Sequence, residues 1–184
     1  MVSPKIEERM AVALPLFQFG FKEDGSGTRT EKDLAAMEIL LEVLASEASP
    51  LFRELLDQGL VNESSFSYEY FEGTGYATVM FGGESQDPEA VAQAICQELQ
   101  RLYREGIPRE AFERAKRALY GENISALNST ASTANGVLNL SLKGRELFAY
   151  IDALADITVE DAAQKLELLR EDRSVLSVVW PLEP

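Results

Sequence analysis

The chain contains no histidine, and Cys96 is its only cysteine. Serine and cysteine hydrolases that use an imidazole base are therefore excluded. Protein zinc sites need imidazole or several thiolate ligands, which one cysteine cannot supply. Composition leaves open a carboxylate-only Mg²⁺ or Ca²⁺ site, but the sequence has no aspartate-rich loop with ligand spacing. We therefore expect no catalytic residue and no metal ligand in this chain.

Acidic residues dominate the remaining ionisable groups, with 31 Asp and Glu against 17 Lys and Arg, and a net charge of −14. Such a charge repels phosphate backbones and anionic membrane surfaces, so we expect neither nucleic acid nor membrane as a partner. No spacing among the carboxylates singles out an acid/base pair. We interpret nearly all of them as solvated surface, although an unrelated small enzyme that uses carboxylates is a further alternative.

Arg145 and Tyr150 are the two candidates for binding substrate. They lie five residues apart near the start of an expected helix, where both could donate hydrogen bonds to peptide carbonyls. The favoured alternative is one solvated arginine and one half-buried tyrosine. Similarly, Tyr68, Tyr70 and Phe71 could line a peptide groove, but aromatic residues on strands more often belong to the core or to cross-strand pairs.

Alternation of apolar residues predicts four strands. The first covers residues 11–21, with Phe17, Phe19 and Phe21 on one face. Two more, around residues 66–70 and 77–81, are joined by a turn at residues 72–75. The last covers residues 174–180. Polar residues 23–27 predict a turn after the first strand.

Capping signals and apolar spacing predict the helices. Thr30 and Asp33, like Thr158 and Asp161, have the spacing of a capping box. Ser49-Pro50 and Asp87-Pro88 place a capping side chain before a proline at the first helical position. Each of these signals precedes an expected helix. Further helices are expected to begin at Pro108 and near Leu147. The loosely patterned residues 122–143 are also expected to be helical.

The element order predicts an α+β domain in two layers, with a mostly antiparallel sheet of about four or more strands packed on helices. We assign residues 11–182 to this single domain and residues 1–10 to an N-terminal extension. The first and last strands are far apart in sequence but could be neighbours in the sheet. Cys96 lies in an apolar run and is expected to be a buried small hydrophobe. Residues 1–9 lack the apolar core of a signal peptide, and no apolar run approaches the ~20 residues that span a bilayer, so we expect a cytoplasmic protein.

Three segments, taken together in this order, resemble insulinase-like (pitrilysin-family) peptidases. Residues 49–61, SPLFRELLDQGLV, are similar to the family's "LF..LRE..GL.Y" helix and turn. Residues 87–116 are similar to its "L..L...G(V/I)...E(L/F)..AK" pair of helices. Residues 150–162 are similar to its "Y...L..(I/V)T.EDV" start of a last helix. The resemblance covers about residues 10–182, and the opening strand also resembles a bacterial subgroup of zinc peptidases encoded as a pair of related proteins.

The resemblance implies a mitochondrial-processing-peptidase-like metallohydrolase fold. Family members have two similar α+β halves that enclose a chamber, and only the N-terminal half carries the zinc motif His-x-x-Glu-His. A chain without histidine corresponds to the other, C-terminal half, which has no metal, closes the chamber and helps to hold the peptide. The expected partners are a catalytic half and a peptide substrate, in a homodimer or heterodimer, with zinc only on the partner half.

This chain departs from the family pattern at two positions. Active members carry an Arg and a Tyr that position substrate. Here the Arg position falls on Leu55 or Leu56, depending on a one-residue gap, and the Tyr position falls on Asn62. The resemblance therefore carries over no catalytic residue. A proteolytically inactive structural or interaction subunit with the same fold is the alternative. The family's usual length also favours a domain excised from a longer protein.

Overall fold

A single five-stranded sheet runs through the protein in the computed structural model, which describes residues 4–23, 29–73 and 75–182. Its strand order is β1-β5-β2-β4-β3, and each neighbouring pair is antiparallel except β1 and β5. The sheet thus confirms the mostly antiparallel arrangement, and the first predicted strand is a neighbour of the last. The strands are β1 (Lys5–Met10), β2 (Leu16–Glu23), β3 (Ser67–Gly73), β4 (Tyr76–Glu84) and β5 (Ser174–Pro181).

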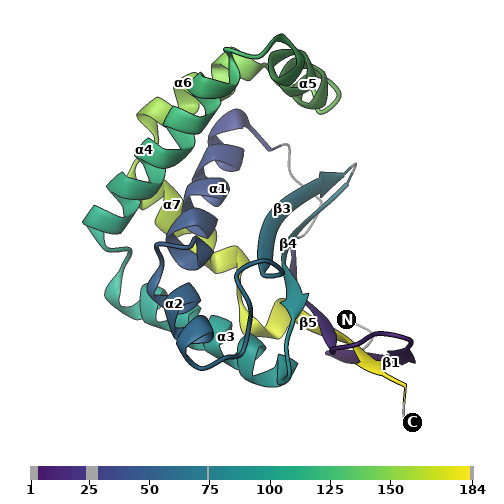
Figure 1. Cartoon of the computed structure of the whole chain (residues 1–184). Helices are drawn as coiled ribbons and strands as arrows, with labels where there is room; N and C mark the ends of the chain where they lie inside the picture. The colour runs from purple at the N-terminus through teal and green to yellow at the C-terminus, as the bar shows by residue number, and fades with distance from the viewer. Residues whose placement is uncertain (1–3, 24–28, 74, 183–184) are drawn as a thin grey trace.

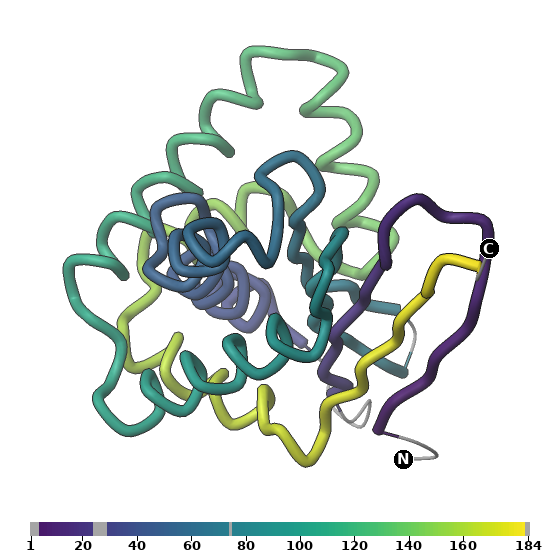
Figure 2. Tube along the Cα trace, turned by 60° about the horizontal axis from the view of Figure 1, so that its bottom comes forward, coloured from purple at the N-terminus to yellow at the C-terminus, as the bar shows by residue number. Residues whose placement is uncertain are grey.

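Strand β1 is the element that the sequence did not predict. It lies within the range 1–10 described above as an extension, yet it pairs along its whole length with β5, from Lys5 opposite Leu176 to Met10 opposite Pro181. Figure 2 shows the two segments running side by side. The strand expected at residue 11 begins instead at Leu16. The turn expected at residues 23–27 lies mostly outside the described residues.

The helices lie together on one side of the sheet (Figure 1). This two-layer arrangement confirms the predicted α+β class. Within the described ranges, none of the helices is long and apolar enough to cross a bilayer. They are α1 (Glu31–Ala45), α2 (Pro50–Asp57), α3 (Pro88–Glu105), α4 (Arg109–Ala126), α5 (Thr130–Ser141), α6 (Leu147–Asp156) and α7 (Val159–Lys165), followed by 3₁₀ turns at Leu166–Leu168 and Glu171–Arg173.

The predicted capping signals operate as expected. In the box at the start of α1, Asp33 N donates to Thr30 Oγ1 at 3.2 Å and Thr30 N donates to Asp33 Oδ2 at 2.9 Å. Thr158 and Asp161 form the equivalent box before α7. Each box satisfies backbone groups that the first helical turn cannot pair internally. These local bonds fix where the helices begin.

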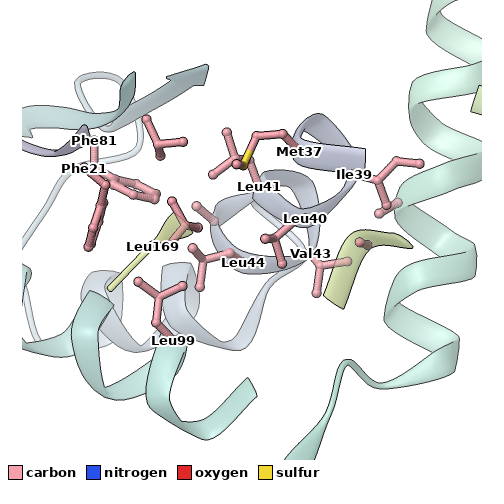
Figure 3. Close-up of a cluster of buried hydrophobic side chains, with 14 of the residues drawn as sticks. Phe21, Met37, Ile39, Leu40, Leu41, Val43, Leu44, Phe81, Leu99 and Leu169 are labelled. Carbon is pink, nitrogen blue, oxygen red and sulfur yellow. The ribbon is translucent and has the colours of Figure 1, made fainter. Parts of the chain in front are cut away.

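Helix α1 lies at the centre of the core between the sheet and the other helices (Figure 3). Leu34, Met37, Leu41 and Leu44, which recur at spacings of three and four along one side of the helix, are buried, and so are residues on its other sides, including Ile39 and Val43. On the sheet, Phe17, Phe19 and Phe21 alternate onto the same buried face as Val79 and Phe81. Apolar side chains that surround a helix in this way make it a buried element.

The loosely patterned stretch at residues 122–143 is helical but broken. Helix α4 ends at Ala126, and α5 begins at Thr130 after Ser129, whose hydroxyl accepts a hydrogen bond from Ser132 N. Helix α5 lies at one end of the helical layer, beside α6 (Figure 1). Leu140 is its one buried residue. The loosely patterned stretch therefore contains a short turn between two helices.

Candidate functional site

The segment that joins α2 to β3 holds the positions where the family pattern expects Arg and Tyr. Helix α2 ends in a Schellman motif, because Leu60 N donates to Leu55 O and Gly59 N donates to Leu56 O, each at 2.9 Å. Gly59 adopts the left-handed conformation that this ending requires, with φ at 67°. Leu55 is fully buried and Leu56 is half-buried against the core. These leucines anchor the helix and offer no polar group to a peptide.

Asn62 has a defined role in the turn that follows. Its Oδ1 accepts hydrogen bonds from Ser65 N and Ser64 Oγ, both at 2.8 Å. Its Nδ2 donates to Glu84 Oε2 at 3.2 Å, which links the turn to the end of β4. Asparagine commonly orders turns by such local bonds. Asn62 is therefore a turn-forming residue at the position where the pattern expects a tyrosine.

Arg145 is buried rather than solvated, so that expectation is wrong. Its guanidinium forms a two-pronged ion pair with Glu72: Nη1 lies 2.6 Å from Oε2 and Nη2 lies 2.8 Å from Oε1. The side chains of Arg145 and Glu72 are only 6% and 5% exposed. The hydrogen bonds to Glu72 raise the pKa of Arg145 further above its ordinary value. A peptide carbonyl would have to displace Glu72 to reach this guanidinium.

Tyr150 is also more deeply buried than the half-buried side chain expected from the sequence. Its hydroxyl donates a hydrogen bond to Glu38 of α1. Burial, together with the nearby Glu38 carboxylate, raises the pKa of Tyr150, and burial likewise raises the pKa of Glu38. Both sequence-predicted donors are thus engaged with carboxylates of the same chain. Their role in binding substrate stays a prediction.

The buried pair formed by Arg145 and Glu72 belongs to a larger, partly buried group, which we call the ion-pair cluster (Glu23, Arg29, Tyr70, Glu72, Arg145). Arg29 Nε lies 3.1 Å from Glu23 Oε2, and Tyr70 donates to the same oxygen at 2.7 Å. Arg145 Nε donates to the carbonyl of Arg29 at 3.3 Å. Among the described residues, Arg29 Nη2 is the one buried side-chain nitrogen or oxygen with no hydrogen-bond partner. The cluster ties β2, β3 and the start of α1 to the α5–α6 connection.

Glu72 and Glu38 are polar residues whose partners could not be predicted from the sequence pattern. Glu72 was placed in a turn, but it lies near the end of β3 on the same face as Tyr68 and Tyr70. That alternation was the available signal for its burial. The two tyrosines point towards the helices and bind Glu42 and Glu23, whereas Phe71 faces the other side and contacts Tyr76. The aromatic residues of β3 are therefore cross-strand and core contacts.

A surface groove of ≈760 Å³ lies between α3 and the 3₁₀ turns. Its floor is apolar (Leu99, Leu166, Leu169), and Tyr103 on its rim donates to Glu167 at 2.9 Å. Cys96 also lines the groove and is half-buried. Burial raises the pKa of its thiol to about 11, so the thiol stays protonated and unreactive near neutral pH.

In the described part of the chain, residues able to hold zinc do not come together. Across residues 4–23, 29–73 and 75–182, no group of three or more Cys, Asp and Glu side chains could hold a metal ion. The donor set also lacks imidazole throughout the sequence. The chain's own residues therefore do not fit a zinc centre.

Comparisons with known proteins give one consistent family. The model of the peptidase M16 inactive domain matches residues 3–119. Among curated proteins, the chain is 28% identical over 179 residues to the uncharacterized zinc protease YmfH of Bacillus subtilis (strain 168), an alignment that covers 95% of this chain and 41% of YmfH.

Solved structures agree in fold. An M16-like peptidase from Alicyclobacillus acidocaldarius superimposes with a TM-score of 0.87 at 31% identity, over 97% of this chain and 44% of that one. The inactive peptidase domain of a zinc protease from Bordetella parapertussis superimposes with a TM-score of 0.77 at 16% identity, over 96% and 95% of the two chains. The chain thus spans less than half of YmfH and of the Alicyclobacillus protein but nearly all of the Bordetella domain.

Proposed function

Because the chain belongs to the family of peptidase M16 inactive domains, we propose that it is the zinc-free half of a two-half zinc peptidase. In this role it closes a chamber around peptides and shapes which peptides enter, while a separate half with His-x-x-Glu-His carries the metal. The family match over residues 3–119 is the observation that carries this proposal. The absence of histidine supports it, because the chain lacks the residue on which such zinc motifs depend.

The length relations support the existence of a second half. The chain aligns with 44% of an M16-like peptidase at 31% identity, so more than half of that relative lies outside the alignment. Zinc on the other half would supply the activated water and polarise the peptide carbonyl. This chain would supply apolar walls and the backbone groups of a sheet edge, along which an extended peptide would add as a strand.

The departures from the family pattern favour a second candidate function. Leu55, Leu56 and Asn62 hold the turn after α2 together and stand in place of the Arg and Tyr donors of the family pattern. A subunit that keeps the fold and joins an assembly without taking part in proteolysis would need no such donors. Peptidase activity of the assembled protein separates the two candidates.

The test uses the purified chain and the catalytic half with His-x-x-Glu-His, separately and mixed, with an unfolded peptide as substrate. We expect each alone to be inactive and the mixture to cleave the peptide until a zinc chelator is added. A stable but inactive complex would favour the structural subunit. Elemental analysis of the chain alone is the second measurement: one zinc ion per chain would overturn the assignment to the zinc-free half.

A further inference from the structure

The outer surface of α5 lies in a stretch without charge. Residues 123–142 contain no Asp, Glu, Lys or Arg, although these make up 26% of the whole chain. Most of the α5 side chains are exposed to solvent. Charged residues are depleted where proteins contact one another, whereas a free helix surface normally carries them. The stretch therefore has the composition of a contact surface in an exposed position.

One face of α5 turns towards α6 and the opposite face is open. A Cβ atom added at Gly136 would lie 3.5 Å from Leu147 Cδ1, so the Gly136 side of the helix lies against α6. Successive helical residues turn by about 100°, which places Leu138 on the opposite side. The exposed residues around that direction form what we call the α5 stripe: Ala131, Ala134, Asn135, Leu138 and Leu142.

The stripe leaves large apolar side chains in water. Leu138 is 56% exposed and Leu142 is 78% exposed. Isolated helices of about this length are marginal in water, and packing normally stabilises them. With Leu140 as its one buried residue, α5 receives little packing from its own chain. A partner that covers the stripe would supply the contact that the chain does not.

We propose that the partner is a second copy of this chain, held by an antiparallel pair of α5 helices related by a twofold axis. The spacing of the stripe is self-complementary: with the axis between Asn135 and Leu138, Ala131 faces Leu142 of the second copy and Asn135 faces Leu138. Small residues then oppose large ones, as close helix packing requires. This inference does not depend on the proposed peptidase role.

Electrostatics also favour a second copy over a basic partner. A basic protein would be expected to engage the acidic side chains, and the stripe offers it none. Two chains of net charge −14 repel each other over most of their surfaces, so they can approach most closely where both are uncharged. The same repulsion makes the dimer weak at low salt, and added salt strengthens it by screening.

Sedimentation velocity over a range of protein and NaCl concentrations tests the proposal. We expect a monomer–dimer equilibrium in which the dimer fraction rises with protein concentration and with NaCl concentration. Leu138→Glu places a charge on the stripe and is expected to weaken the dimer by about tenfold or more, a shift of about 1.4 kcal/mol or more. Leu142→Glu is expected to act in the same direction, and circular dichroism checks that each variant is folded.

Met10→Glu is the matched control, because Met10 is similarly exposed, at 53%, but lies on β1. It is expected to leave the dimer unchanged. The proposal is overturned if the unaltered chain stays monomeric at every concentration and salt. It is also overturned if the dimer survives both glutamate substitutions on α5 or is lost with Met10→Glu.

Discussion

Helices α1 and α5 are packed very differently in the same layer. In α1, ten of fifteen residues are buried, and the helix contacts the sheet and several other helices. In α5, Leu140 alone of twelve residues is buried, and the described contacts are mainly with α6. Helix α1 contains the mostly apolar sequence LAAMEILLEVLA, whose side chains make core contacts around the helix. Helix α5 is built from Ser, Thr, Ala and Asn with a few leucines. Stability therefore rests on α1 and its neighbours, and α5 is left available for contacts with other molecules.

Truncating one large side chain in each region gives the largest expected contrast. Phe81 is fully buried beside Phe21, and Phe81→Ala should lower the free energy of unfolding by about 3–5 kcal/mol, through lost burial and the cavity left behind. Leu138→Ala on α5 should change it by no more than about 0.5 kcal/mol. Urea denaturation at low protein concentration measures both. Similar losses at the two sites would show that α5 is packed as tightly as the core.

Breaking the ion-pair cluster tests the connection between the two regions. Glu72→Gln leaves Arg145 buried without a charged partner, which should cost about 3 kcal/mol, because removing one member of a buried pair strands the other. Hydrogen exchange should also become faster in α5 and the α5–α6 connection. Glu69→Gln, on the exposed face of the same strand, is the control and should have little effect. Equal effects of the two substitutions would contradict the role of the cluster.

Removing the N-cap should destabilise the protein more at α1 than at α5. The contrast in the free energy of unfolding should be smaller than for the substitutions above. Thr30→Ala removes the capping box of α1 and should lower the free energy of unfolding by about 1 kcal/mol. Ser129→Ala removes the cap of α5 and should fray that helix while changing global unfolding by less than about 0.5 kcal/mol. Thermal denaturation combined with hydrogen exchange distinguishes the two. A larger global loss at Ser129 would reverse the comparison.

The smallest expected effect is the pH dependence of the stability that Asp33 contributes. Burial would raise the pKa of Asp33, but hydrogen bonds from Lys165, at 2.6 Å, and Thr30 lower it to about 2. The carboxylate therefore stabilises the folded state above its ordinary pKa of 3.8, and this contribution is lost as pH falls towards 2. The site is partly exposed, so its worth is less than about 1 kcal/mol after screening. The difference in unfolding free energy between the unaltered chain and Asp33→Asn should shrink as pH falls from 3.8 towards 2. A difference that stays constant with pH would contradict the lowered pKa of Asp33.

Local signals account for the parts of the fold that the sequence predicted well. Thr30 with Asp33, Thr158 with Asp161, and Ser49 before Pro50 each place a helix start from a few neighbouring residues. The alternation of Phe17, Phe19 and Phe21 placed a strand, because its buried face repeats every second residue. These features depend on chemistry within one turn or one strand.

Features that depend on distant partners were not predicted. The sequence of β1, KIEERM, has no clear alternation and becomes a strand by pairing with β5. Arg145 is buried because Glu72, 73 residues away, neutralises it. Tyr150 is buried because its hydroxyl donates a hydrogen bond to Glu38, which is also distant in the sequence. A single sequence does not show which charge will meet which, so the polar groups between elements were the hardest part of the site to predict.

The position of β5 between β1 and β2 also governs the order in which the sheet can assemble. Strand β2 pairs with β4 on one side, but its other neighbour follows roughly 150 residues later in the chain (Figure 2). At synthesis rates of ~5–20 residues per second, that interval lasts on the order of 10 seconds. Throughout it, β2 presents an unpaired edge and β1 has no partner in the sheet. The nascent chain is therefore most exposed to wrong strand pairing until residues 174–181 emerge.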